Sequence, residues 1–412
     1  MAGNNGTREP PASEPTLRQV LDGIDPKLRS VLLPFAIRHP RRFWAYGKLI
    51  RGYERARKAR KACREQGLTV PPFLIVSITS RCNLRCFGCY AVASGILGDP
   101  DGVHASKTAP HLSVDKWRTI IKEACDLGVF GFIIAGGEPF MYPGLLDLCA
   151  EFDDRVFIIV TNGTAISEGH YERLKRISNV CIVVSIEGPR DVTDARRGKG
   201  VFSRAMSTIQ RLGRMGVISG ISTTVTRRNH HYWMDPASID GLTDQGVMLG
   251  VFIEHIPTSS PSSIDCSTDQ NIMLTPEERA KFRAAMMSYR EQSPIYIIHS
   301  PGDEELFGGC VSAGRGFAHI TPAGDLTPCP VSDVATHNLT RATLRDGLAS
   351  PLFREIRECK DLLETGDSPC ALFSHPDELS ELAKRVGAYR TKDGPGGPPR
   401  ATKTKKKEEV LT

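Results

Sequence analysis

Residues 81–90 read RCNLRCFGCY, and they directly follow the apolar run FLIVSIT at 73–79. This run has the length and composition of a buried strand. Cys82, Cys86 and Cys89 therefore stand in a C-x3-C-x2-C array in the loop that leaves the strand, where three thiolates can surround one metal centre. Cysteine thiolates are the usual ligands of iron–sulfur clusters, and three of them leave one iron of a 4Fe-4S cluster without a protein ligand.

Two alternatives explain the same cysteines differently. A zinc site normally takes four ligands with paired spacing, and His104, which could supply the fourth, stands far along the following loop. The triplet can also arise by chance. We favour the cluster because the array stands at the end of a strand, a context that neither alternative requires.

Strand-like and helix-like segments alternate after this loop. The expected strands are 73–79, 130–136, 156–162, 180–188, 217–226 and 247–256. The expected helices between them are 114–128, 142–153, 167–177, 201–214 and 236–247. Such alternation predicts an α/β fold with a parallel sheet and right-handed crossovers. Six units of this kind predict a partial (β/α)6 TIM-like barrel, whose chemistry belongs at the C-terminal ends of the strands.

Composition divides the chain further. We expect an N-terminal helical extension before the barrel and a small C-terminal α+β module, rich in Cys, Gly and Pro, after it. The tail has almost nothing to bury and should be disordered. The expected segments are 1–15 (disordered), 16–70 (basic helical extension), 71–256 (barrel), 257–294 (linker and helix), 295–390 (the cysteine-containing module) and 391–412 (disordered basic tail).

The charge is unevenly distributed along the chain. The formal net charge is +6, yet residues 1–70 alone hold 15 Lys and Arg against 6 Asp and Glu. This excess is typical either of a solvated basic helix pair or of a surface for an acidic partner. We favour the first reading and expect no nucleic-acid partner.

The N-terminal residues are polar and lack the apolar core of a signal peptide. No apolar run approaches the length of a membrane span. We therefore expect a cytoplasmic protein without a membrane span. In that reducing compartment its 12 cysteines stay available for metals rather than disulfides.

The ends of the later strands carry further motifs. The second strand is followed by GGEP at 136–139, the third by TNG at 161–163, and the fourth by SIEG at 185–188. Together with the cysteine array, and in this order, they resemble the radical S-adenosylmethionine (SAM) superfamily over about residues 73–256. Gly88 stands where relatives often have an aromatic residue, and Tyr90 follows instead.

The resemblance implies that Cys82, Cys86 and Cys89 hold a catalytic 4Fe-4S cluster with an open iron, and that SAM binds beside it. Glu187 stands where many relatives carry aspartate. The SAM-binding residues implied by the resemblance are Tyr90, Gly136, Gly137, Glu138, Pro139, Thr161, Asn162, Ser185, Glu187 and Arg197.

A second cysteine group begins with the pattern C-x13-G-x4-C at Cys310, Gly324 and Cys329, where HITPAGDLTPC is typical of a hairpin. It resembles the opening half of the SPASM/twitch module. This implies one auxiliary 4Fe-4S cluster held by Cys310, Cys329 and Cys370. Cys359 is a fourth ligand or a core residue, and the fourth position can also be open. We interpret Cys63, Cys125, Cys149 and Cys181 as core residues and assign no role to Cys266.

The family resemblance implies an enzyme that cleaves SAM reductively and removes hydrogen from a substrate through a 5′-deoxyadenosyl radical. An external electron donor of the flavodoxin or ferredoxin type is then required. Glu254 and His255, at the end of the sixth strand, are candidate catalytic residues. We expect a peptide or protein substrate. The alternatives are small-molecule, cofactor or lipid biosynthesis, and a non-enzymatic iron–sulfur redox sensor, which would have no use for the GGEP motif.

Overall fold

The structure is a computed structural model that describes residues 40–97, 111–256, 272–365 and 369–392. The expected disordered N-terminus and most of the expected tail lie outside these residues, as do the whole 257–271 linker, His104 and Cys266. Among the described helices, none is long and apolar enough to cross a membrane.

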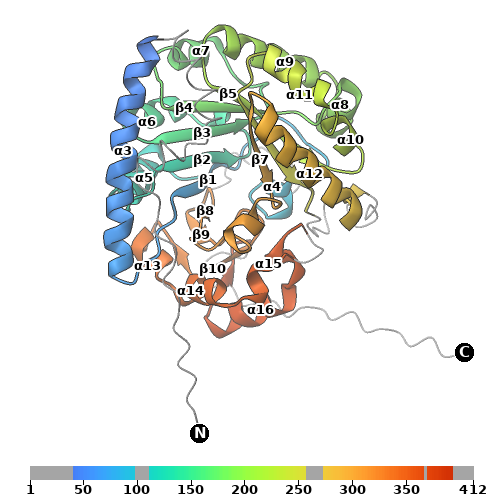
Figure 1. Ribbon diagram of the computed structural model, residues 1–412. Helices are drawn as coiled ribbons and strands as arrows, with labels where there is room; N and C mark the ends of the chain where they lie inside the picture. The colour runs from blue at the N-terminus through green and yellow to red at the C-terminus, as the bar shows by residue number, and fades with distance from the viewer. Residues whose placement is uncertain (1–39, 98–110, 257–271, 366–368, 393–412) are drawn as a thin grey trace, which may run out of the picture.

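One sheet runs through most of the molecule (Figure 1). Its strand order is β11-β9-β8-β1-β2-β3-β4-β5-β6-β7, and β8 to β7 are parallel throughout. The strands are β1 (Phe73–Thr79), β2 (Gly131–Gly136), β3 (Val156–Thr161), β4 (Val180–Ser185), β5 (Ser219–Val225), β6 (Leu249–Glu254), β7 (Tyr296–Ser300), β8 (Phe317–Ile320), β9 (Asp325–Thr327) and β11 (His337–Asn338). The sequential order of β1 to β7 is that of a partial TIM-like barrel, which confirms the predicted fold class.

Helices connect the parallel strands on the outside of the sheet, as crossover connections require. They are α5 (Val114–Leu127), α6 (Leu145–Glu151), α7 (Glu168–Leu174), α8 (Arg190–Arg197), α9 (Val201–Arg214), α10 (His230–Trp233), α11 (Pro236–Asp244) and α12 (Pro276–Gln292). α5 shows why they form where they do: the Ser113 side chain accepts a hydrogen bond from the Lys116 N–H, and Gly128 ends the helix with φ of 107°. Both ends agree with the prediction.

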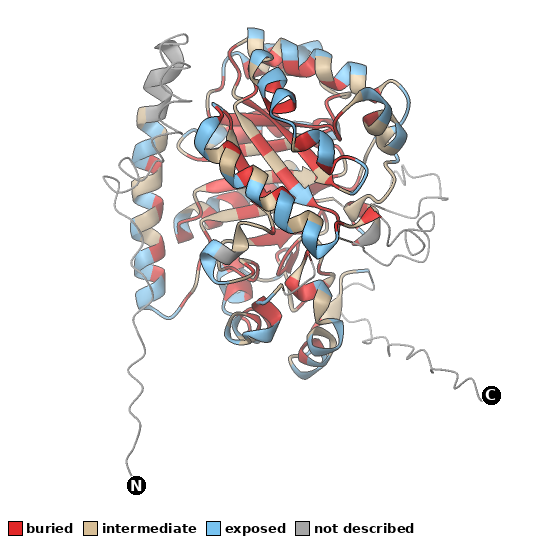
Figure 2. Cartoon of the chain, turned by 45° about the vertical axis from the view of Figure 1, so that its right-hand side comes forward, coloured by how far each residue is buried: buried red, intermediate tan, exposed pale blue. Residues whose placement is uncertain are grey.

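The core lies along the sheet, where buried residues concentrate (Figure 2). All six residues of β4 are buried, as expected for a parallel strand covered on both faces. Phe132 and Phe157 stand opposite each other on β2 and β3, with their rings stacked 5.1 Å apart.

The C-terminal part is joined to the barrel by its backbone. β8 adds to the free edge of β1, and β9 and β11 continue the sheet outward. A two-stranded ribbon of β10 (Val334–Ala335) and β12 (Tyr389–Arg390) lies outside the main sheet. The small helices here are α13 (Leu344–Leu348), α14 (Pro351–Glu358), α15 (Ala371–Ser374) and α16 (Pro376–Arg385). The predicted hairpin is present as β8 and β9.

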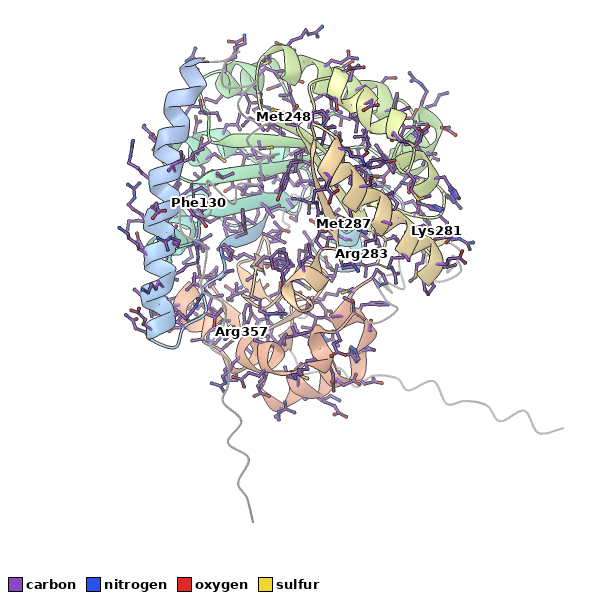
Figure 3. The ribbon with its side chains drawn as sticks, in the orientation of Figure 1. Phe130, Met248, Lys281, Arg283, Met287 and Arg357 are labelled. Atoms are coloured by element: carbon purple, nitrogen blue, oxygen red, sulfur yellow. The ribbon has the colours of Figure 1, made fainter. Side chains whose placement is uncertain are left out.

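The described part of the basic extension is the single helix α3 (Pro40–Glu65), which lies along α5 (Figure 1). Lys48 and Arg55 form ion pairs with Asp153 and Asp154, in the turn before β3. Phe130, labelled in Figure 3, meets Tyr53 of α3 edge-on at 5.2 Å. Part of the basic charge of this segment is therefore used to dock the helix onto the protein's own acidic turn.

Candidate functional site

The predicted SAM-binding and catalytic residues and the first cysteine group lie at or just after the C-terminal ends of β1, β2, β3, β4 and β6. Because these strands are parallel neighbours, their ends meet at one edge of the sheet. The sequence motifs that are far apart along the chain are therefore adjacent in space.

The cysteine loop is held in shape by its own backbone and by α8. The Cys82 sulfur accepts a hydrogen bond from the Leu84 N–H at 3.5 Å. The Phe87 N–H donates to the Arg196 carbonyl at 2.9 Å, and the Arg196 guanidinium donates back to the Gly88 carbonyl at 3.3 Å. Cys89 then starts the short helix α4 (Tyr90–Ala93). Contacts within the loop and with α8 thus fix the loop from two sides.

The three thiols lie near enough to influence one another's ionisation. Burial raises the pKa of the Cys82 thiol to about 12, and the neighbouring Cys86 and Cys89 add to this effect. Burial also raises the pKa of Cys86, although Arg197 and Arg196 act in the opposite direction. Positive charge beside a thiol favours the thiolate, which is the form that binds metal.

Among the described side chains, no three histidine, cysteine, aspartate or glutamate residues converge closely enough to hold a single metal ion. A 4Fe-4S cluster differs because each cysteine binds a separate iron, so its ligands stand farther apart than those of one ion. The three neighbouring thiols, the N–H bond to sulfur and the nearby arginines fit such a cluster better than one zinc ion.

Gly136 and Gly137 allow the end of β2 to lie directly on the cysteine loop. A Cβ at Gly137 would stand 2.0 Å from the Arg81 carbonyl oxygen, and Gly136 has φ of 115°. The N–H groups of Gly137 and Glu138 donate to the carbonyls of Thr79 and Arg81 at 2.8 and 2.7 Å. The glycines therefore serve close packing between strand ends, a role that the motif alone does not reveal.

Glu138 is 1% exposed and joins the ends of β2 and β3. Its carboxylate accepts hydrogen bonds from the Thr161 hydroxyl at 2.6 Å, the Asn162 N–H at 2.8 Å and the Phe140 N–H at 3.1 Å. Burial raises its pKa, while these three donors oppose that rise. Pro139, also buried, begins the short 3-10 turn that follows. These hydrogen bonds join Glu138 to the TNG turn. The sequence interpretation had placed both motifs at the same SAM site.

Glu187 binds two arginines of α8. Its Oε1 lies 2.5 Å from Arg196 Nη1 and 2.6 Å from Arg197 Nη2, and its Oε2 accepts the Thr224 N–H at 3.0 Å. Burial opposes ionisation, but the two arginines outweigh it and hold the pKa of Glu187 below its usual value. Arg197, expected to meet a carboxylate of SAM, thus already binds a carboxylate of the protein. A guanidinium has five N–H donors and can hold a second carboxylate as well.

The remaining predicted residues lie at the same edge. The Tyr90 hydroxyl accepts a hydrogen bond from the Gly136 N–H at 3.4 Å, so the residue after the cysteine array contacts the GGEP motif. Ser185, the last residue of β4, is 7% exposed.

Glu254 and His255 occupy different surroundings. Glu254 is bound by Arg279 at 2.5 Å and lies 3.2 Å from His299 Nε2, so its carboxylate is part of an ion-pair network between β6, α12 and β7. His255 instead faces the cysteine loop: a Cβ at Gly88 would stand 3.3 Å from its Cε1. Of the two candidates, His255 is the one that the fold brings to the cysteines.

The sequence interpretation missed two residues of this site. Arg196 holds the cysteine loop and Glu187, and Asn83 joins the loop to the TNG turn, since its side chain bonds to Asn162 and Thr164 at 2.8 Å each. The pair of adjacent arginines after the fourth strand was a signal that could have indicated Arg196. The asparagine inside the cysteine array was a weaker signal for Asn83.

Comparison with known proteins agrees with this geometry. Residues 76–235 match the family model of the Radical SAM superfamily. This part of the chain is a radical SAM domain. The matched range begins inside β1 and ends after β5, so it contains the cysteine loop, Glu138 and Glu187.

Proteins similar to this chain differ in how much of its length they match. The mycofactocin maturase MftC of Mycobacterium tuberculosis is 28% identical over 311 residues, covering 71% of this chain and 74% of the relative. The Fe-coproporphyrin III synthase of Methanosarcina barkeri is 29% identical over 161 residues, only 38% of either chain. Among solved structures, Streptococcus suis SuiB bound to its precursor peptide SuiA has a TM-score of 0.59 at 18% identity, covering 77% of this chain and 73% of SuiB. That likeness shows the fold.

The chain gathers a second cysteine group in its C-terminal part. Cys310 and Cys370 both act electrostatically on Cys329, and Cys370 also acts on Cys310. Burial raises the pKa of Cys310 to about 12 and that of Cys370 to about 11. We call these three residues the auxiliary cysteines.

The surroundings of the auxiliary cysteines suit thiolates bound to a cluster. Backbone groups beside all three sulfurs act against burial and lower the pKa of the thiols: Ser312 at Cys310, Val331 and Ser332 at Cys329, and Leu372 and Phe373 at Cys370. Backbone dipoles of this kind favour thiolates and tune the potential of iron–sulfur clusters. The Ser332 hydroxyl is buried and has no hydrogen-bond partner in the described part of the chain. These features fit a bound cluster.

Cys359 lies apart from this pattern. It ends α14, packs against the core, and acts electrostatically on Arg385 of α16. Arg357 of the same helix, labelled in Figure 3, donates to the Ala313 carbonyl at 3.0 Å. The core interpretation of Cys359 accounts for these contacts, and its ligand role stays an untested prediction.

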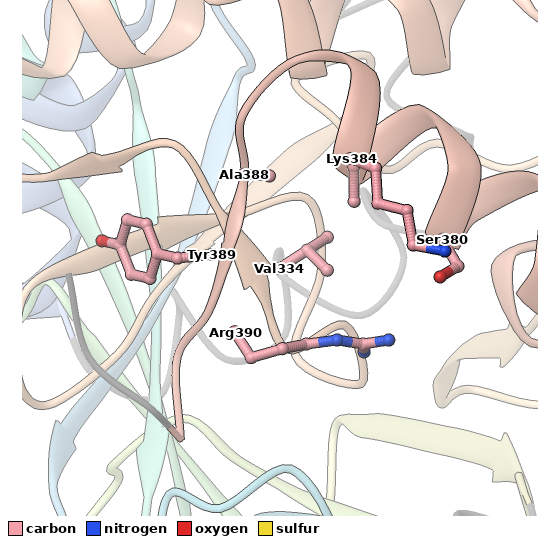
Figure 4. A pocket seen from close by; sticks show the side chains of 7 residues that line it. Val334, Ser380, Lys384, Ala388, Tyr389 and Arg390 are labelled. Carbon is pink, nitrogen blue, oxygen red and sulfur yellow. The ribbon is translucent and has the colours of Figure 1, made fainter. Parts of the chain in front are cut away.

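Two surface hollows lie outside both cysteine groups. One, lined by Val334, Lys384 and Arg390 among others, separates the β10–β12 ribbon from α16 (Figure 4). The other, of about 410 Å³, lies between α10 and α12 and is lined by His230, His231 and Lys281 among others. Neither lining contains a cysteine.

Proposed function

We propose that this radical SAM enzyme binds a catalytic 4Fe-4S cluster through Cys82, Cys86 and Cys89 and cleaves SAM reductively to modify a peptide or protein. The observation that carries the proposal is the meeting of the cysteine loop with Glu138 and the Glu187–Arg197 pair at one edge of the sheet. Together with such a cluster and one electron, SAM supplies a 5′-deoxyadenosyl radical that removes hydrogen from an unactivated carbon.

The residues of the chain have distinct tasks in this proposal. Glu138, with Thr161 and Asn162, presents a buried acceptor for the ammonium group of SAM. Arg197 uses its remaining donors for the carboxylate of SAM. His255, beside Gly88, is a candidate to contact substrate or move a proton. The strand ends position SAM and exclude water from it.

The peptide substrate is supported by two observations. MftC, whose match to this chain covers 71% of its length at 28% identity, is a maturase. SuiB, which has the same fold, binds a precursor peptide. The surface near the auxiliary cysteines also exposes apolar side chains suited to a peptide: Leu306 and Phe307 are 61% and 64% exposed, and Phe373 is 39% exposed. The likeness to Fe-coproporphyrin III synthase favours a small-molecule substrate as the second candidate.

We further propose one auxiliary 4Fe-4S cluster on the auxiliary cysteines and an external donor of the flavodoxin or ferredoxin class for the electron. The proximity of the three auxiliary cysteines supports the cluster.

The test is an anaerobic assay of the reconstituted protein with SAM and dithionite, following 5′-deoxyadenosine. We expect 5′-deoxyadenosine from the parent chain and none from Cys82→Ala, with Cys181→Ala, a buried cysteine of β4, retaining the parent's rate. A parent that never binds SAM would refute the proposal. Mass spectrometry after incubation with short peptides encoded beside this chain, and in parallel with iron coproporphyrin, then separates the two substrate classes.

A further inference from the structure

Two short spacers, residues 83–85 and 87–88, separate the three cysteines of the loop after β1. Each spacer is bound through one side chain to a different strand end. Asn83 joins the first spacer to the TNG turn after β3, and Arg196 of α8 joins the second spacer to Glu187 after β4. We call these two side-chain contacts the loop anchors.

The first loop anchor is the Asn83 side chain. Its amide nitrogen donates to the Thr164 hydroxyl at 2.8 Å, and its amide oxygen accepts from the Asn162 side chain at 2.8 Å. Asn162 is held in turn by Glu138, whose carboxylate accepts the Asn162 N–H at 2.8 Å. The first spacer is therefore bound to residues that the proposed function assigns to SAM.

The second loop anchor is Arg196. Its guanidinium donates to the Gly88 carbonyl at 3.3 Å, and its own carbonyl accepts the Phe87 N–H at 2.9 Å. Gly88 has φ of 61° and no side chain with which to anchor itself. The same guanidinium lies 2.5 Å from Glu187, whose side chain is 1% exposed and also accepts the Thr224 N–H at 3.0 Å. A buried, charge-assisted contact of this kind gives Arg196 a fixed position.

With one anchor on each spacer, the three thiols are fixed relative to one another. Among the described residues, they do not converge on a single-ion site, and a 4Fe-4S cluster needs them apart because each binds a separate iron. Residues that orient metal ligands commonly matter nearly as much as the ligands. Resting on the proposed catalytic cluster, we propose that Asn83 and Arg196 are positioning residues that keep the cysteine loop spread to hold it.

The test measures how firmly the full-length chain keeps its catalytic iron. The variants are Asn83→Ala, Arg196→Lys and the two combined. Lysine keeps a positive charge beside the buried Glu187, but it lacks the second nitrogen with which the guanidinium reaches the loop. The matched control is Arg190→Lys, because Arg190 begins the same helix and donates to Ser203 of α9.

Each protein is reconstituted anaerobically with iron and sulfide, and the release of iron to a chelator is followed over time. A baseline chain with Cys82→Ala, Cys86→Ala and Cys89→Ala identifies the iron held elsewhere. We expect the double variant to release its catalytic iron about 10-fold faster than the parent, or more, and Arg190→Lys to match the parent. The electron paramagnetic resonance of the reduced catalytic cluster should change in the double variant and not in the control. The same two substitutions made in the baseline chain should not speed iron release.

Catalytic iron kept as firmly by the double variant as by the parent would overturn the proposal. Equally faster release from the baseline chain would overturn it too, because the substitutions would then weaken the fold rather than the loop. Asn83 is exposed, so metal-free Asn83→Ala should unfold thermally like the metal-free parent, and a large loss of stability would also count against a positioning role. If the parent holds no more iron than the baseline chain, the catalytic cluster itself is absent, and the proposed function fails together with this inference.

Discussion

At the scale of single residues, Glu138 is a buried carboxylate that accepts three hydrogen bonds. Replacing it with Gln turns one carboxylate oxygen into an NH2 group. This group must face either the Asn162 N–H or the Phe140 N–H, both of which are donors. Lost hydrogen bonds to a buried charged group cost about 1.5–3 kcal/mol each. We expect Glu138→Gln to lower the free energy of unfolding by about 2–3 kcal/mol and to weaken SAM binding.

Urea unfolding and equilibrium dialysis with labelled SAM measure these two effects. The matched control is Glu168→Gln, because Glu168 pairs with Arg211 at the surface and its side chain is 76% exposed. Exposed ion pairs contribute little to stability, so the control should leave the free energy of unfolding close to that of the parent. Equal effects of the two substitutions would contradict the role given to Glu138.

The sequence indicated which residues lie together at the site, but it did not indicate the hydrogen-bond and ion-pair partners of each residue. Glu138, Thr161 and Asn162 were grouped by motif order, and the fold brings them together. The ion pairs of Glu187 with Arg196 and Arg197 were not predicted. They join a residue after a strand to residues of the following helix, so they depend on how that helix packs against the strand end. Composition and spacing do not show this packing.

At the scale of secondary structure, the docking of α3 depends on one glycine. A Cβ at Gly52 would stand 1.9 Å from the Asp154 carbonyl oxygen, whereas at Gly47 the nearest atom is a flexible arginine nitrogen at 3.8 Å. We expect Gly52→Ala to cost about 1–3 kcal/mol, as overpacking does, because the helix must move off the turn before β3. Gly47→Ala should stabilise by up to about 1 kcal/mol through helix propensity alone.

Thermal unfolding of the two variants beside the parent measures this difference. Both substitutions place alanine in the same helix, so propensity cancels between them. A Gly52→Ala variant as stable as Gly47→Ala would show that α3 does not pack against the acidic turn.

The bounds of local elements were largely predictable, and their partners were not. Ser113 and Gly128 mark the ends of α5 in the sequence because caps act on neighbouring residues. Tyr296–Ser300 was expected to open the C-terminal module, yet it pairs with β6 as the seventh barrel strand. A run of five residues carries no signal of which distant strand it will join.

At the scale of the whole molecule, His319 connects the barrel to the C-terminal part. Its ring nitrogens lie 2.8 Å from the hydroxyls of Ser77 on β1 and Thr327 on β9. Burial lowers its pKa to about 3. An unfolded histidine binds a proton near pH 6.5, so the unfolded state gains protons first as the pH falls. This contribution to stability is present above about pH 6.5 and is lost progressively toward pH 3, by up to about 1.4 kcal/mol per pH unit.

Urea unfolding of the parent and of His319→Gln at pH 7.5 and 5.5 tests this dependence. The parent should lose more stability between the two values than the variant does. His375→Gln, at a partly exposed histidine of α15–α16, should keep the parent's dependence. Identical losses in the parent and in His319→Gln would show that His319 does not remain neutral in the folded state.

The pairing of β8 with β1 has a mechanical consequence. Cys82 lies in the loop after β1, and Cys310 and Cys329 flank the hairpin of β8 and β9, whose first strand is hydrogen-bonded to β1. Changing their separation would require breaking ladder bonds in the middle of a ten-stranded sheet. The distance between the two proposed cluster sites is therefore set by the sheet. A substrate that reaches both sites has to move relative to this rigid frame, because the sheet cannot open or close around it.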